Sequence, residues 1–153
     1  MKAIKLMVVI VTCLVSSQLP AADGEGPFFD LEHFLTEKKA LIEETLPLTE
    51  QEKLAFWPLY DNYMQELVKL LERRTALNKE LMNTQKTITA KEARAMIDEH
   101  FSIVSEGVNV KKSMLVKLRN KMPDRKILKF FQVEEKIEAA YFYFLSEKIP
   151  AVK

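Results

Sequence analysis

The segment 50–83 carries a run of positions that alternate steps of three and four residues, and this pattern narrows the fold more than any other feature. The positions are Tyr60, Tyr63, Leu67, Leu70, Arg74, Leu77 and Leu81. Such spacing predicts one long helix with a coiled-coil seam. At 1.5 Å per residue this helix is roughly 50 Å long. It therefore needs a neighbour of similar length to cover its seam.

A second long helix is predicted after the turn "NTQKTITAKEA" (83–93). Thr89 and Glu92 have the spacing of a capping box, as do Thr49 and Glu52 before the first long helix. The second long helix should reach about Met122, and its expected seam is Ala93, Ile97, Phe101 (or His100), Val104, Val108, Leu115, Leu118 and Met122. A short turn between two long helices predicts an antiparallel hairpin.

Shorter helices are expected at about Leu31–Thr45 and from Asp124 to about Lys148. The seam of the last helix should be Ile127, Phe130, Ile137, Tyr141 and Phe144. Pro58 is expected to kink the first long helix near Leu54. No run alternates with period two, so no strands are predicted. The predicted fold is all-α: an elongated antiparallel helical hairpin of two long helices with a shorter flanking helix at each end.

The N-terminal residues have the pattern of a cleaved signal peptide over 1–22. Lys2 and Lys5 precede an apolar run over 6–15, and small and turn-forming residues follow it. The run is shorter than the roughly 20 residues of a spanning helix. We expect a linker over 23–30, a single helical domain over 31–153, and a periplasmic location. Cys13, the only cysteine, lies in the cleaved part, so disulfides, thiolate metal sites and cysteine nucleophiles are not expected.

Charge is unevenly distributed along the chain. Residues 23–52 carry nine acids against two lysines, and residues 111–129 carry eight basic residues against one acid. The two blocks either neutralise each other or form separate solvated faces, or else the basic block faces an acidic partner. The candidate partner-binding cations are Lys111, Lys112, Lys117, Arg119, Lys121 and Arg125. Anionic lipid headgroups are an alternative target, whereas export separates the protein from nucleic acid.

Several motifs carry a resemblance to known exported proteins. "LTEQE" (48–52) and "ITAKE" (88–92) resemble the LTxxQ motif of the Spy/CpxP group of periplasmic proteins, although Gln51 falls one residue early. "FWPLYDNY" (56–63), "KFFQVEEKIEA" (129–139) and "KIPAV" (148–152) are similar to blocks in uncharacterised proteobacterial exported proteins. The Spy/CpxP resemblance implies a helical hairpin that binds unfolded or misassembled envelope proteins without nucleotide.

Residue types that carry catalysis or bind cofactors are few. The sequence has two histidines, and it lacks a Gly-rich phosphate loop, a G-x-S-x-G motif and an H-E-x-x-H motif. We therefore predict a protein that is not an enzyme and needs no cofactor. Met96 and His100 share a helix face and are weak candidates for a metal site, although stable sites need more convergent ligands.

Four consecutive aromatic residues, 141–144, point almost all the way round a helix. Phe142 and Tyr143 fall outside the expected seam. The first helix, with Phe28, Phe29 and Phe34, is one possible cover; a homodimer interface and a binding site for other chains are the alternatives.

The function predicted from these features is that of a periplasmic chaperone or envelope-stress adaptor, associated as a homodimer. In the expected mechanism basic residues attract acidic clients, and exposed aromatic and Met side chains make apolar contact. A dedicated partner of one envelope protein and a metal-resistance or metal-sensing protein are the alternatives. Contact with a membrane surface is compatible with this prediction, whereas integral insertion is not.

Overall fold

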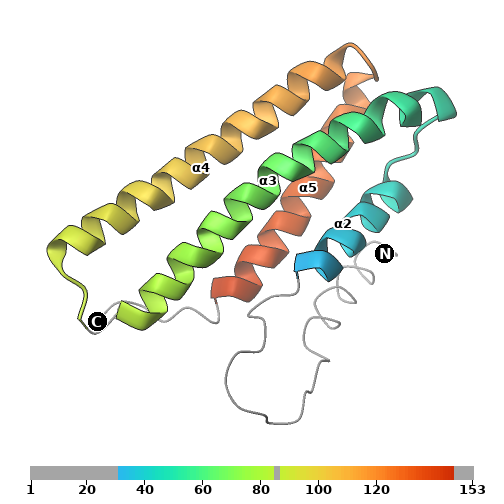
Figure 1. Ribbon diagram of the computed structural model, residues 1–153. Helices are drawn as coiled ribbons and strands as arrows, with labels where there is room; N and C mark the ends of the chain where they lie inside the picture. The colour runs from blue at the N-terminus through green and yellow to red at the C-terminus, as the bar shows by residue number, and fades with distance from the viewer. Residues whose placement is uncertain (1–30, 85–86, 147–153) are drawn as a thin grey trace, which may run out of the picture. The chain divides into compact units, whose positions relative to one another are not determined.

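The computed structural model describes residues 31–84 and 87–146, and all secondary structure in these residues is helical. In chain order the helices are α2 (Leu31–Thr45), α3 (Glu50–Thr84), α4 (Ala90–Arg119) and α5 (Asp124–Ser146), as Figure 1 shows. The predicted all-α class and the order of four helices are confirmed. The predicted signal peptide (1–22), linker (23–30) and final block (148–152) lie outside the described residues.

Both predicted capping boxes are present. At the start of α4 the Glu92 carboxylate accepts a hydrogen bond from the Thr89 backbone N–H at 2.8 Å, and the Thr89 hydroxyl accepts one from the Glu92 N–H at 3.3 Å. Thr49 and Glu52 exchange the same two bonds before α3, at 2.7 and 3.3 Å. These bonds satisfy backbone donors that a helix start leaves unpaired. Capping chemistry therefore sets where both long helices begin.

The described residues divide into two units. The first unit contains residues 31–47 and 128–145, that is, α2 and most of α5. The α5 residues Phe130, Ile137, Tyr141 and Phe144 are buried here, as the predicted seam requires. The ring of Phe34 on α2 lies 5.2 Å from that of Tyr141. A buried ion pair of 2.8 Å between Lys38 Nζ and Glu134 Oε2 also joins the two helices.

The second unit contains residues 48–127 and Ser146, with α3, α4 and the first residues of α5. α3 and α4 pack against each other and run in opposite directions (Figure 1). Arg73 contacts Glu99, whereas the earlier residue Tyr63 lines a small pocket together with the later Met114. The buried residues of α3 are Phe56, Tyr60, Tyr63 and Leu70, three of which belong to the predicted seam.

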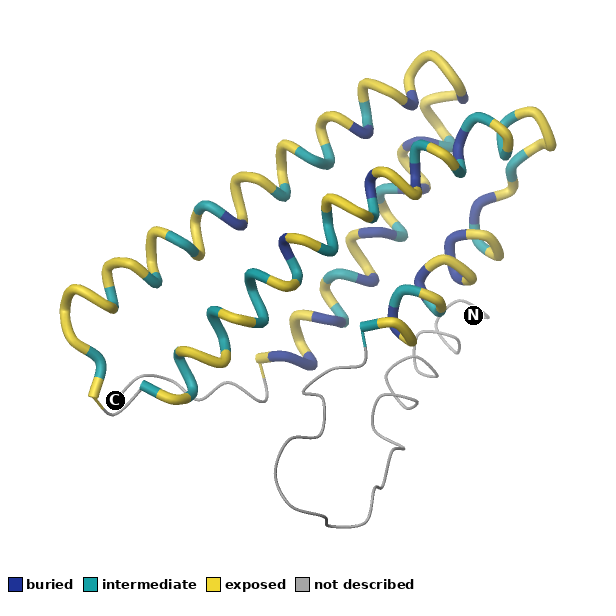
Figure 2. The backbone as a smooth tube through the Cα atoms, viewed as in Figure 1, coloured by how far each residue is buried: buried dark blue, intermediate teal, exposed yellow. Residues whose placement is uncertain are grey.

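The predicted seam of α4 is wrong over residues 97–108. Ile97, Phe101, Val104 and Val108 are exposed, and the buried α4 residues are Ile103, Met114 and Leu118 (Figure 2). The expected positions repeat every 3.5 residues on a helix of 3.6 residues per turn, so the series drifts by about 20° per heptad. Over the three heptads from Ile97 to Leu118 this drift is about 60°, toward the side of α4 that contains the buried Met114.

Candidate functional site

Four of the five large apolar residues that are exposed on α4 form one stripe, and the fifth, Val116, lies about 100° round the helix from Ile97. Ile97, Phe101, Val104 and Val108 have 56%, 65%, 42% and 45% of their surface exposed. Each lies two residues from a residue that takes part in the α3–α4 contact, namely Glu99, Glu106 or Val110. Two residues correspond to about 200° round a helix. The stripe therefore lies on the side of α4 opposite α3, which we call the outward face.

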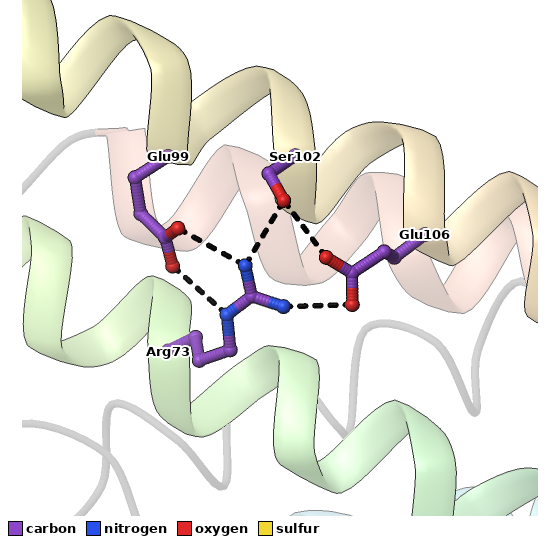
Figure 3. A network of polar contacts seen from close by, with 4 residues as sticks. All are labelled: Arg73, Glu99, Ser102 and Glu106. Carbon is purple, nitrogen blue, oxygen red and sulfur yellow. Dashed lines mark hydrogen bonds and ion pairs between the residues drawn. The ribbon is translucent and has the colours of Figure 1, made fainter.

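A single arginine of α3 fixes the rotation of α4. Arg73 donates hydrogen bonds from Nε and one terminal nitrogen to the two carboxylate oxygens of Glu99, at 2.8 and 3.0 Å (Figure 3). Its other terminal nitrogen donates a hydrogen bond to the Glu106 carboxylate at 2.8 Å. Ser102 accepts a bond from Arg73 at 3.2 Å and donates one to Glu106 at 2.8 Å. The planar guanidinium suits such forked contacts. With Glu99 and Glu106 held toward α3, the stripe must face away from it.

The same contacts shift the ionisation of the three charged groups. The hydrogen bonds from Arg73 hold the pKa of the Glu99 carboxyl below its ordinary value. The pKa of Glu106 is lowered by Arg73 first and by Ser102 second. Hydrogen bonds to Glu99 and Glu106 raise the pKa of Arg73 further above its already high value. All three groups are therefore charged at neutral pH.

Part of the predicted charge neutralisation is present inside the second unit. Lys126, at the start of α5, donates a hydrogen bond from Nζ to Oε2 of Glu52 at 2.6 Å. Glu52 belongs to the acidic block and Lys126 to the basic block. The hydrogen bond from Lys126, followed by the backbone bond from Thr49, lowers the pKa of Glu52. One acid of the N-terminal block therefore does pair with the basic block.

The predicted partner-binding cations do not share one face. Lys112, Lys117, Arg119, Lys121 and Arg125 are exposed, and Lys111 is half-buried. At 100° per residue, Lys112 and Arg119 lie within about 20° of the direction of Phe101. The exposed Arg94, which the prediction missed, lies in the same direction. Lys117 instead lines the small pocket between α3 and α4. Lys121 and Arg125 lie beyond the end of α4.

Phe142 and Tyr143 belong to the first unit and are exposed by 37% and 65%. They lie outside the α5 seam, as expected. Phe34 of α2 contacts Tyr141, and the ring of Phe142 lies 5.6 Å from that of Tyr141. Phe28 and Phe29, the other expected cover, are outside the described residues. The structure therefore places the α4 stripe and these two rings in different units.

The weak metal candidates, Met96 and His100, occupy different environments. Met96 is half-buried, whereas His100 is exposed with its ring 5.3 Å from that of Phe101. Over residues 31–84 and 87–146, no group of three His, Cys, Asp or Glu side chains is placed to hold a metal ion. His100 therefore borders the apolar stripe of the outward face.

Sequence reasoning found the residues of the outward face but assigned them to the α3 contact. A usable signal was present, because Glu99 and Glu106 are seven residues apart and an arginine lies in the facing helix. Acids at heptad spacing can form interhelical salt bridges with a basic residue of the neighbouring helix.

Comparisons with protein-family models, curated proteins and solved structures gave no match. Within the described ranges, no helix has a segment that is both long and apolar enough to cross a bilayer.

Proposed function

We propose that this protein is a non-enzymatic periplasmic chaperone or envelope-stress adaptor that holds unfolded envelope proteins without ATP. The observation that carries this proposal is the outward face of α4, where four large apolar side chains are exposed in one line. Exposed apolar patches of this kind mark interaction surfaces. The signal-peptide pattern of 1–22 and the degenerate LTxxQ motifs support the compartment and the similarity to the Spy/CpxP group.

The proposed architecture is an elongated helical hairpin built on α3 and α4. Its outward face would meet a client in two stages. Arg94, Lys112 and Arg119 attract acidic segments over a distance, because opposite charges steer association. Ile97, Phe101 and the two valines then cover apolar side chains of the client. No chemical step and no cofactor is required.

Light scattering of a chemically unfolded client tests the proposal. The purified protein, expressed from the full-length sequence, is mixed with the client at near-stoichiometric ratio without ATP. We expect suppressed aggregation that weakens with added salt, because salt screens the steering charges. The variant Ile97→Ser with Phe101→Ser should lose most of the suppression. Leu54→Ser on α3 is the matched control, since Leu54 is also exposed.

Two results would contradict the proposal. One is an absence of suppression at several-fold excess of the protein. The other is equal suppression by the α4 variant and by wild type, which would remove the outward face from the mechanism. Phe142→Ser with Tyr143→Ser, tested beside them, measures the contribution of the exposed rings on α5.

A dedicated partner of one envelope protein is the second candidate function. The regular four–three–four spacing of the stripe favours it, because a general holding surface needs no fixed register. A pull-down from the native envelope separates the two candidates. One stoichiometric partner supports the dedicated role, and a broad set of proteins supports the chaperone.

A further inference from the structure

We infer that the outward face of α4 binds one amphipathic helix of another protein, with carboxylates next to both ends of its apolar seam. This inference rests on the proposed function only in taking α4 as a protein-binding surface. It adds the shape of the partner, the length of the seam and the sign of its flanking charges.

The stripe has the geometry of a coiled-coil seam. Its residues follow steps of four, three and four, which is the a/d spacing that a second helix fills. From Ile97 to Val108 the seam is roughly 17 Å long at 1.5 Å per residue. Two exposed polar residues, Asp98 and Ser105, border it on one side. Helices that lie in a membrane surface have a broad apolar face instead, so a helical partner fits better than a lipid surface.

The two ends of the stripe are basic, and three of the four acids of α4 are used in contacts within the chain, Asp98 being the exception. Glu92 caps the helix, and Glu99 and Glu106 bind Arg73. Three residues before Ile97 lies Arg94, and four residues after Val108 lies Lys112. Both are exposed. Flanking charges of a coiled coil select the partner, so the partner should carry Asp or Glu at both ends.

A second copy of α4 is a poor occupant of the same seam. In an antiparallel pair, Ile97 would face Val108 of the copy and Phe101 would face Val104. The next layer would place Arg94 against Lys111. In a parallel pair, Arg94 would meet the same arginine of the copy. Like charges across a seam oppose association. Both pairings of two α4 copies are therefore disfavoured, and a different helix with acidic flanking residues fits better.

Two designed peptides test the inference by fluorescence anisotropy. Both form amphipathic helices with four apolar seam layers; one has Glu on each side of the seam and the other has Lys at the same positions. The purified full chain should bind the Glu peptide at least about tenfold more tightly, as expected for a few exposed ion pairs. Ile97→Ser with Phe101→Ser should abolish binding of the Glu peptide, whereas Leu54→Ser should leave it unchanged.

Charge reversal gives the decisive comparison. Arg94→Glu with Lys112→Glu should invert the preference, so that the Lys peptide binds more tightly than the Glu peptide. Unchanged helical circular dichroism shows that each variant is folded. Equal affinity of wild type for the two peptides would overturn the inference. So would binding to vesicles of phosphatidylethanolamine and phosphatidylglycerol without binding of either peptide, or a dimer that Phe101→Ser dissociates.

Failure of this inference is separate from failure of the proposed function. If the protein suppresses aggregation but binds neither peptide, the helical partner is wrong and the holding function stands. If it binds the Glu peptide and suppresses no aggregation, the general chaperone is wrong, and the face serves a dedicated helix.

Discussion

Gly107 is the residue at which a small change has the clearest expected effect on stability. It lies inside α4, and a Cβ added there would lie 3.8 Å from Leu70 Cδ1, an ordinary van der Waals distance. Gly107→Ala should therefore raise the free energy of unfolding by about 0.5–1 kcal/mol through helix propensity and a less flexible unfolded chain. Urea unfolding monitored by circular dichroism measures this change in the free energy of unfolding.

Asn109→Ala, at an exposed position of the same helix, is the control for the Gly107 substitution. Asn109→Ala should raise the free energy of unfolding by less than Gly107→Ala does, because asparagine destabilises a helix less than glycine does. A loss of stability in Gly107→Ala would show that α3 and α4 need the glycine for closer approach.

The contact between α3 and α4 should make stability depend on pH in acid. The pKa values of Glu99 and Glu106 are lowered by Arg73, so the unfolded chain binds more protons than the folded one as the pH falls. We expect a constant free energy of unfolding near neutral pH. It should decrease as the pH drops below the ordinary glutamate range, about 4.3, because the stabilisation is lost as the lowered pKa values are reached.

Arg73→Met isolates this dependence. Urea unfolding at a series of pH values should give a flatter acid limb than in wild type. A residual slope should stay, because Glu52 and Glu92 also have lowered pKa values from other contacts. An acid limb as steep as that of wild type would mean that the Arg73 contacts do not stabilise the folded state.

At the scale of single helices, the sequence predicts where the helices lie well, but it predicts poorly which face of α4 is buried. Helix starts follow from local chemistry, as Thr89 and Glu92 show. The apolar positions of the α5 seam follow from their spacing, whereas the buried Glu134, which the same spacing includes, pairs with Lys38 and gives no apolar signal. The α3-facing side of α4 instead contains Glu99, Glu106 and a glycine. Hydrophobicity therefore indicated the stripe that is exposed, and only the facing Arg73 explains why.

For the whole molecule, the buried Lys38–Glu134 pair tests whether the two units unfold together. The described part of the first unit, 31–47 and 128–145, has fewer than the roughly 40 residues that usually fold alone without a disulfide or metal. We expect one cooperative transition. Lys38→Met leaves a buried carboxylate without its cation, so it should cost about 3–5 kcal/mol.

Two probes measure the cooperativity. Trp57, the single tryptophan of the sequence, belongs to the second unit, where its ring centroid lies 5.1 Å from that of Phe56. Its fluorescence therefore reports on that unit. Circular dichroism reports on all helices. Lys38→Met should shift both urea midpoints equally, and adding Glu134→Leu should restore most of the loss. An unchanged Trp57 midpoint beside a shifted circular dichroism midpoint would show that the units unfold separately.

The burial of the apolar series at its C-terminal end limits what can dock on α4. Beyond Val108 the next residues of the series are Leu115, which is half-buried, and Leu118, which is fully buried, so a partner that follows the seam from Ile97 meets no further exposed residue of the series. The exposed seam therefore spans only about three helical turns. The apolar contact therefore has a fixed length: a longer partner gains no further apolar contact with this series from its extra turns, and a shorter one leaves part of the stripe exposed to water.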